Sequence, residues 1–203
     1  MLELSGPSAL AVRRGSASNL CVHRCSYHAG YPLPTLLRLA RLIKAHIAPL
    51  DTILSYSNYD LQNPSFASFV PQFKAAGLVQ VATASPFSMG LLTPRPPEWH
   101  PAPPALRDVV KQAAALTDDA GFAGGLPAVA LGFALRQTVG LEEVPRVVGL
   151  SNLREVHETM RVWRGVNEGS ELGKASKALE EQVRTLFASA GWAGWCWASP
   201  ADA

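Results

Sequence analysis

The sequence predicts an α/β protein built from parallel strand–helix units. Amphipathic helical segments alternate with short apolar runs of the length of buried strands, and the links between them are short. The chain has 203 residues, of which 48% are hydrophobic, so it is long enough for one domain with a substantial core. The alternation makes a parallel sheet with packed helices the expected fold class.

The first half of the chain holds two such units. Apolar side chains recur at helical spacing over residues 33–47 while basic side chains fall on the opposite face, which predicts an amphipathic helix. A strand is predicted at residues 51–59 and a helix, marked by spaced phenylalanines, at residues 66–77. The apolar run 78–84 predicts a second strand, and Pro86 ends it because proline cannot donate to a sheet.

A proline-rich stretch, residues 93–104, follows that strand and is expected to be a stiff loop without regular structure. Helical periodicity predicts helices at residues 105–120 and 128–138, and the second is so apolar that we expect it to be buried. A charged helix is predicted at residues 176–190. The tail, residues 191–200, holds three of the five tryptophans, so we expect it to dock on the body or on a partner.

The segment from residue 146 to residue 164 carries the strongest site signal that the residues give by themselves. A strand at 146–150 runs into a helix at 153–164, for which Ser151 or Asn152 is the expected N-cap. The free N–H groups of a helix N-terminus favour an anion such as a phosphate, and Arg154 adds positive charge. Simple helix capping is the interpretation that this spacing favours.

Composition argues against several classes of function. The net charge of +2, without a basic stripe, gives no case for nucleic acid, and no apolar run is long enough to span a membrane. The three cysteines do not form a disulfide framework or a metal-ligand pattern, so we expect no metal and a reducing, cytoplasmic setting. Residues 1–28 lack helical or strand periodicity and are left unassigned. They are interpreted as a disordered or misassigned start, with a faint resemblance to a transit peptide. Residues 29–203 are expected to form the domain.

The residues alone identify no catalytic group. His100 lies in the proline-rich loop, where a general acid or base is conceivable but a hydrogen-bonded loop residue is the favoured interpretation. Tyr56 and Tyr59 flank a strand end, where they either stack on a flat ligand or pack at the rim. Neither a dinucleotide-binding glycine fingerprint nor a P-loop occurs.

Several motifs in the same order resemble the aldo-keto reductases, which are (β/α)8 barrels that use NAD or NADP. The resemblance is most specific to the branch of L-galactose and D-arabinose dehydrogenases. The matching segments are LSYSNYDLQN (54–63), ASPFSMGLLT (84–93), PEWHPAP (97–103), VGLSNLREVHE (148–158) and WCWASP (195–200).

The resemblance implies three groups of cofactor-binding residues. The loop that wraps the pyrophosphate side corresponds to Ser85, Pro86, Phe87, Met89, Gly90 and Leu91. The adenosine-phosphate end corresponds to Gly149, Ser151, Asn152, Leu153, Glu155 and Glu158. Tyr56 stands near the position of the nicotinamide.

The resemblance also implies that the family's catalytic Asp, Tyr, Lys and His are absent, because those residues come from the first four strand–helix units. Gly30 corresponds to the end of the fifth strand, and the residues before it are too few for four units. We therefore expect a partial TIM barrel, the carboxyl half of the family's (β/α)8 barrel, with a remnant of a strand near Ala29. The full-length form would oxidise an aldose such as L-galactose or D-arabinose at C1. The alternative is an inactive half barrel that at most binds nucleotide or a partner, including a second copy through its open sheet edges.

Overall fold

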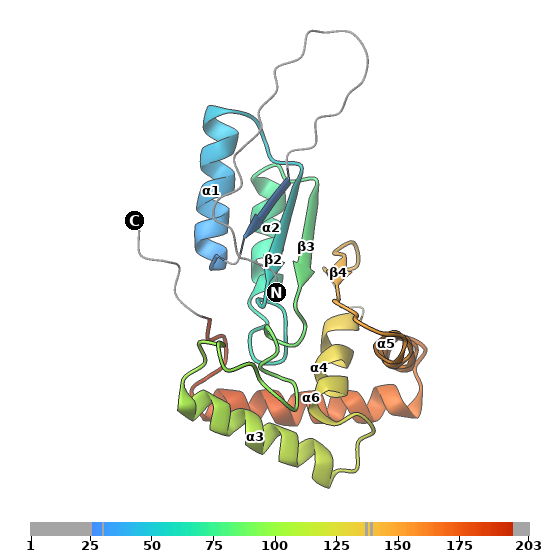
Figure 1. Ribbon diagram of the computed structural model, residues 1–203. Helices are drawn as coiled ribbons and strands as arrows, with labels where there is room; N and C mark the ends of the chain where they lie inside the picture. The colour runs from blue at the N-terminus through green and yellow to red at the C-terminus, as the bar shows by residue number, and fades with distance from the viewer. Residues whose placement is uncertain (1–25, 30, 137, 139, 197–203) are drawn as a thin grey trace.

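The computed structural model describes residues 26–29, 31–136, 138 and 140–196 (Figure 1). Most of the unassigned segment 1–28 therefore lies outside the described residues, as does the end of the tail. Residues 26–28 lie in the first strand. The structure confirms a mixed α/β fold with a small parallel sheet.

The sheet has four strands in the order of the chain, and every pair is parallel. Its strands are β1 (Ser26–Ala29), β2 (Thr52–Tyr56), β3 (Gln80–Ala84) and β4 (Arg146–Val147). The strands therefore end at the same edge, with β2 and β3 in full register and β4 joined to β3 by only two residue pairs. Loops that leave this edge are brought together by the topology alone.

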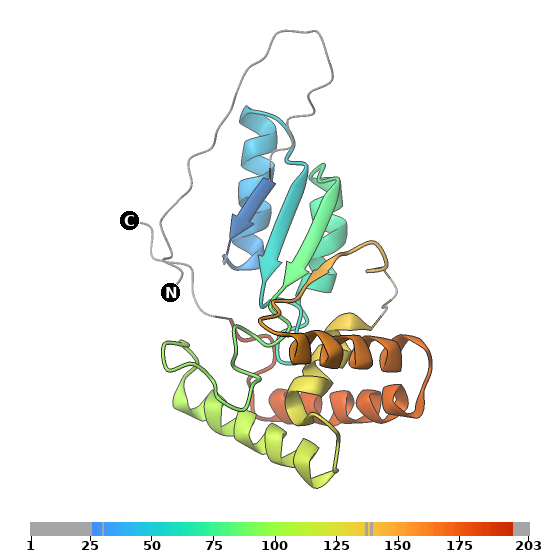
Figure 2. The same cartoon turned by 45° about the vertical axis from the view of Figure 1, so that its right-hand side comes forward.

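Two helices cover one face of the sheet: α1 (Leu33–His46) and α2 (Phe66–Ala75) (Figure 2). Because side chains alternate along a strand, Ile53 and Val81 pack into the core beneath these helices. Leu54, Ala82 and Ala84 form a separate small cluster with Tyr56. Apolar side chains on both faces are typical of parallel sheets that are buried on both sides.

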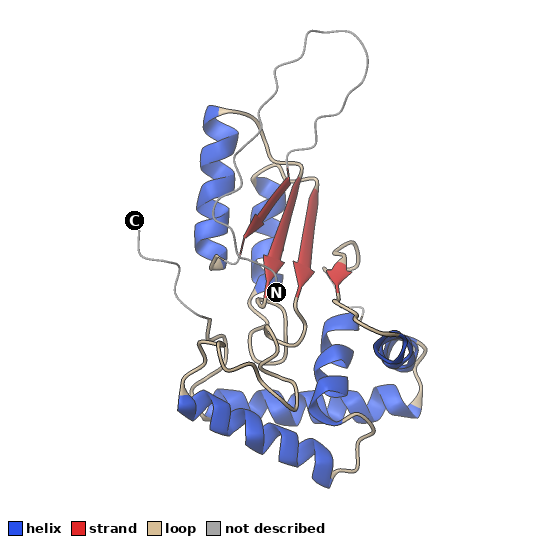
Figure 3. Ribbon diagram, viewed as in Figure 1, coloured by secondary structure: helices blue, strands red, loops and turns tan. Residues whose placement is uncertain are grey.

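Four further helices gather at the carboxyl ends of the strands (Figure 3). They are α3 (Pro104–Asp119), α4 (Gly125–Leu135), α5 (Leu153–Asn167) and α6 (Glu171–Ser189). The apolar α4 is central to this group and contributes to two core clusters, which confirms that it is buried. This second layer of helices places α5 beside the loops that follow the strands.

Most elements differ from their predicted bounds by one to five residues; the strand predicted at residues 51–59, for example, is shortened to Thr52–Tyr56. The helix α6 begins at Glu171 rather than at residue 176, because the Ser170 hydroxyl accepts from the N–H of Gly173 (3.2 Å) and caps it. The helix α4 runs three residues earlier than predicted, between the left-handed Gly124 and the extended Arg136. The strand β4 has two residues instead of five. Within the described part of the chain, no helix is both long and apolar enough to cross a membrane.

Candidate functional site

Backbone strain is concentrated where β2 and β3 end. Among the described residues, the only non-glycine residues with positive φ are Ser57, Ser85, Ser88 and Met89. All four lie just after the carboxyl ends of these two strands. Such conformations cost free energy and cluster at sites where function requires a fixed loop shape.

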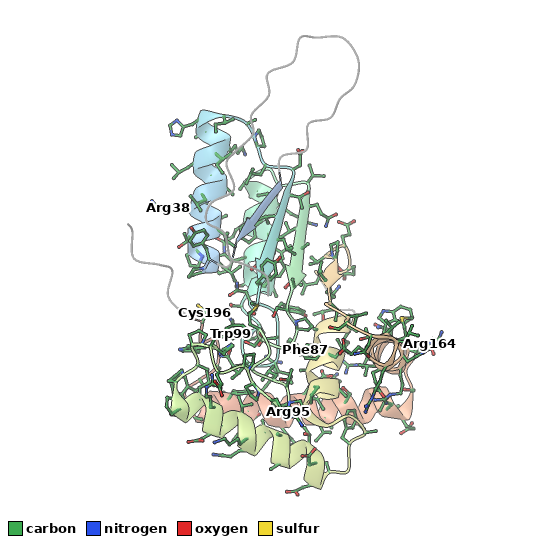
Figure 4. The ribbon with its side chains drawn as sticks, in the orientation of Figure 1. Arg38, Phe87, Arg95, Trp99, Arg164 and Cys196 are labelled. Atoms are coloured by element: carbon green, nitrogen blue, oxygen red, sulfur yellow. The ribbon has the colours of Figure 1, made fainter. Side chains whose placement is uncertain are left out.

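The turn after β3 is held by its own side chains. The Ser85 hydroxyl accepts a hydrogen bond from the Met89 N–H at 2.7 Å. Gly90 has a φ of 91°, and a Cβ there would come within 2.9 Å of the Pro97 ring. The turn therefore needs a glycine at this position, and it presents Phe87 toward α4 and α5 (Figure 4).

The loop after β2 is organised around a fully buried carboxyl group. Oδ1 of Asp60 accepts from the N–H groups of Gln62 (2.9 Å) and Asn63 (2.8 Å). Its Oδ2 is buried and has no hydrogen-bond partner of good geometry. The nearby Ser88 hydroxyl nevertheless favours the ionised carboxylate and so lowers the pKa of Asp60. Burial outweighs these hydrogen bonds and raises the pKa of Asp60 to about 7.

His100 is a structural residue of the proline-rich loop. Its Nδ1 accepts from the N–H of Ala102 at 3.1 Å, so Nε2 carries the proton and donates to the Ser88 carbonyl at 3.0 Å. Burial lowers the pKa of this imidazole below its usual value. Arg107 donates to the carbonyls of Pro97 and His100. These bonds fix the loop, in agreement with the interpretation of His100 as a hydrogen-bonded loop residue.

The N-terminus of α5 is capped by two side chains. Oδ1 of Asn152 accepts from the Glu155 N–H at 3.1 Å, which selects Asn152 over Ser151 as the N-cap. The Glu155 carboxylate in turn accepts from the Ser151 N–H (2.6 Å) and from Nδ2 of Asn152 (2.9 Å). The Glu155 carboxylate therefore occupies part of the helix N-terminus at which the sequence predicts a bound anion such as a phosphate.

A cavity of about 650 Å³ lies between the β3 turn, the start of α4 and the first turns of α5. This volume is typical of small-molecule pockets. Five of the predicted cofactor residues line it together: Phe87, Gly149, Asn152, Glu155 and Glu158. Two segments that are about sixty residues apart in the chain thus meet at one site.

The other predicted residues lie around the cavity or away from it. Tyr56 lines a small depression with Trp195, and Pro86 lines another beside Arg146. Ser85, Met89, Gly90 and Leu91 shape the turn, and Leu91 is fully buried in the core. Ser151 and Leu153 are exposed at the start of α5.

The wall of the cavity that α4 supplies was not predicted. Gly124, Pro127, Ala128 and Leu131 line it, and Arg154 and Thr159 complete the α5 side. The only local signal was the Gly124-Gly125 pair, which allows the sharp entry into α4 at a φ of 91°. Within the described ranges, no group of three His, Cys, Asp or Glu side chains is placed to hold a metal ion.

Comparisons with known proteins give two significant relatives. The chain is 35% identical over 134 residues to a protein named L-galactose dehydrogenase from Arabidopsis thaliana, covering 65% of this chain and 39% of that protein. It is 29% identical over 162 residues to D-arabinose 1-dehydrogenase from Saccharomyces cerevisiae, covering 77% of this chain and 47% of that protein. No family model matches the chain. The chain thus spans less than half the length of the curated relatives it matches, and over that part it is homologous to two dehydrogenases.

Proposed function

We propose that the chain is the nucleotide-binding part of an NAD(P)-dependent oxidoreductase of the aldo-keto reductase family. The observation that carries the proposal is the cavity of about 650 Å³ in which Phe87 meets Asn152 and Glu155. The two relatives, both named as dehydrogenases, support the reaction class. In this proposal the whole protein oxidises an aldose such as L-galactose or D-arabinose at C1, in the cytoplasm.

The sheet suits a segment of a (β/α)8 barrel. Its strands are all parallel, follow the order of the chain and carry apolar side chains on both faces. The cavity lies at the carboxyl ends of these strands, where ligands of such folds bind. We therefore infer that residues 29–203 belong to a carboxyl half barrel, as the sequence predicts.

The residues of the cavity fit the adenosine end of a dinucleotide. Phe87, Leu131 and Val162 supply an apolar wall against which a flat base can pack. Arg154 is exposed and has no carboxylate partner among the described residues, so its charge is available to a phosphate. When bound, the nicotinamide would supply the hydride chemistry; the residues described here hold and orient the nucleotide.

The charges of the cavity favour NAD over NADP. One arginine and two glutamates line it; Glu158 is paired with Arg161 at 2.9 Å, which leaves Glu155 as the lining carboxylate without a cationic partner among the described residues. An additional 2′-phosphate would lie among these carboxylates, whereas a ribose hydroxyl can donate to one. We expect NAD⁺ to bind about tenfold more tightly than NADP⁺, a difference of about 1.4 kcal/mol.

The test is a calorimetric titration of the purified chain with NAD⁺, NADP⁺ and ADP. Arg154→Met should weaken ADP binding about tenfold, because it removes the one cationic side chain of the cavity. Arg164→Met is the matched control, since Arg164 is exposed on α5 but does not line the cavity (Figure 4). Glu155→Gln should raise NADP⁺ affinity relative to NAD⁺. Equal loss in both arginine variants, or no binding at all, would contradict the proposal.

The second candidate function is nucleotide or partner binding without catalysis. It is favoured by the burial of His100 and Asp60, whose hydrogen bonds are made within the loops. Neither group is placed to accept the proton that the C1 hydroxyl of an aldose loses on oxidation. We expect no NADH formation by this chain alone with L-galactose or D-arabinose. Turnover that persists after purification to homogeneity would show instead that the described residues include a group that accepts this proton.

A further inference from the structure

A groove of about 500 Å³ lies between α1 and α2, the two helices that cover one face of the sheet. Three apolar side chains line it: Leu37 and Leu42 from α1, and Phe69 from α2. Leu37 is 5% exposed and forms the floor, whereas Leu42 is 43% exposed and forms part of the rim. The groove therefore offers a concave apolar surface that is open to solvent.

Two arginines of α1, Arg38 and Arg41, line the same groove. Both are exposed, and Arg38 projects from the helix (Figure 4). Neither forms an ion pair with a carboxylate among the described residues. Neither α1 nor α2 contains an acidic residue, and Lys44 adds a further positive charge to α1. A negatively charged ligand in the groove would therefore meet attraction without a local carboxylate to oppose it.

The groove does not depend on what pairs with the edges of the sheet. Both of its walls come from helices that are consecutive in the chain and pack on the same face of the sheet (Figure 2). In a (β/α)8 barrel the helices form an outer ring around the strands. Further strands would extend the sheet at β1 and β4 and leave the outward groove between two neighbouring helices in solvent. The groove is thus expected in the proposed whole protein as well as in this chain.

We propose that this groove binds an acidic amphipathic helix of a partner protein. The residues of α1 that line it lie within positions 34–42, which span about 12 Å along the helix axis. This length matches about two turns of a second helix. Apolar side chains at helical spacing on that helix would pack on Leu37 and Phe69. Carboxylates on its flank would accept hydrogen bonds from Arg38 and Arg41, whose planar guanidinium groups suit carboxylates.

Other occupants fit the groove less well. A flat membrane surface would meet the exposed arginines without reaching Leu37, which is almost fully buried beneath them. A nucleic acid needs more phosphate contacts than two arginines supply, in a chain whose net charge is only +2. A small anion would leave the apolar floor uncovered. No residue of the groove lines the cavity of about 650 Å³, so the inference does not rest on the proposed nucleotide binding.

The experiment is a fluorescence-anisotropy titration of a labelled synthetic peptide of about 14 residues with the purified chain. Leucines at helical spacing form one face of the peptide, and glutamates fill the other positions. We expect saturable binding with a Kd below about 1 mM. Arg41→Glu should weaken it about tenfold, because it replaces attraction by repulsion in the groove. Arg164→Glu is the matched control, since Arg164 is exposed on α5 and outside the groove.

Two further probes test the chemistry of the occupant. A scrambled peptide of the same composition, with its leucines spread around the helix, should bind about tenfold more weakly because it has no apolar face. Vesicles that contain phosphatidylserine should not bind the chain in preference to the original peptide. Binding of the peptide should fall as salt is added, because exposed charges are screened.

Weakened binding in Arg41→Glu, with binding kept in Arg164→Glu, supports the proposal. Equal binding by these two variants, equal binding of the scrambled peptide, a preference for the vesicles, or no saturable binding by wild type would overturn it. Circular dichroism checks the fold, and Arg38→Glu takes the place of Arg41→Glu if the latter is unfolded. ADP binding by Arg41→Glu should equal that of wild type, so failure of this proposal and failure of the proposed function are distinguishable.

Discussion

Ser85 and Ser88 show how a single residue can hold a loop in a costly shape. Both have positive φ, at 65° and 49°, in the turn that presents Phe87 to the cavity. A non-glycine residue in this region costs about 1–3 kcal/mol, which surrounding contacts must offset. The hydrogen bond from the Met89 N–H to Ser85 Oγ is one such contact.

Ser85→Ala should therefore destabilise the protein by about 1 kcal/mol, because it removes this hydrogen bond and keeps the strain. Ser85→Gly removes the same bond but relieves the positive φ, so it should be the more stable of the two variants. Urea unfolding measures both. An alanine variant as stable as the glycine variant would show that backbone strain does not contribute here.

Asp60 makes stability depend on pH. The pKa of Asp60 is about 7 in the folded protein and 3.8 without burial. Below pH 3.8 the carboxyl group is protonated in both the folded and the unfolded state, and its favourable contribution to the free energy of unfolding is complete. As the pH rises toward 7, the unfolded state loses its proton first and the native state is destabilised relative to it. Asp60→Asn removes this dependence. Relative to wild type, the variant should gain roughly 2–3 kcal/mol between about pH 5 and about pH 7.

Thermal denaturation of both proteins across this range is the measurement. His100 has the opposite effect, because burial lowers its pKa. Its contribution to the free energy of unfolding is present above pH 6.5 and is lost as the pH falls below that value. Because both proteins retain His100, this effect cancels in the difference. A constant difference between Asp60→Asn and wild type would mean that the Asp60 carboxyl is not effectively buried.

At the scale of elements, the helices α4, α5 and α6 approach one another through glycines. A Cβ on Gly132 would lie 2.5 Å from Ser176 Oγ, and one on Gly173 would overlap the Gly165 carbonyl oxygen. Arg136 closes the same junction: its Nη2 lies 2.6 Å from Glu180 Oε1 and also donates to the Gly173 carbonyl. Glycine contacts and a largely buried ion pair together position α5, and with it one wall of the cavity.

Gly173→Ala should cost about 1–3 kcal/mol, because the added Cβ meets backbone atoms that cannot rotate away. Gly149→Ala is the matched control, since a Cβ there has nothing within 4 Å. Urea unfolding of the two variants should separate them clearly. Equal stability would imply that α5 and α6 can move apart without loss.

At the scale of the whole molecule, the carboxyl-terminal tail ties the helical layer to the loop after β2. Trp192 and Trp195 pack against the core of that layer, which confirms that the described part of the tail docks on the body. The Gly194 N–H donates to the Gln62 carbonyl at 2.8 Å, and Gln62 Nε2 donates to the Trp192 carbonyl. The ring of Trp195 lies 6.4 Å from that of His100.

Trp195→Ala should therefore destabilise the protein by about 2 kcal/mol, less than a fully buried aromatic because the ring is half-buried. Trp99→Ala is the comparison, since Trp99 also contacts His100 but is 66% exposed. We expect its cost to be below about 1 kcal/mol. Thermal unfolding followed by circular dichroism tests both, and a larger loss in Trp99→Ala would contradict tail docking as a stabilising contact.

Helix periodicity and strand-length apolar runs were sufficient to predict the parallel α/β class, the order of the elements from α1 onward and a capped helix after residue 152. The strand β1 was expected only from the resemblance to a known family. They were insufficient for the bounds of α6 and β4. The capping hydroxyl of Ser170 and the pairing of β4 with β3 depend on neighbouring groups in space. The role of His100 also needed the structure, because its partners are backbone groups of Ser88 and Ala102.

The sequence by itself determined which segments from α1 onward form helices and strands, although not their residue bounds, because these segments follow from local spacing of apolar side chains and from prolines and caps. It also placed Phe87 and Asn152 at the ends of different strands. Only the tertiary structure decided that they line one cavity, that Glu155 occupies the helix N-terminus, and that apolar side chains of α5 such as Leu153 and Met160 are exposed. Those outcomes depend on contacts between distant segments, and local sequence patterns carry no information about which distant segments meet.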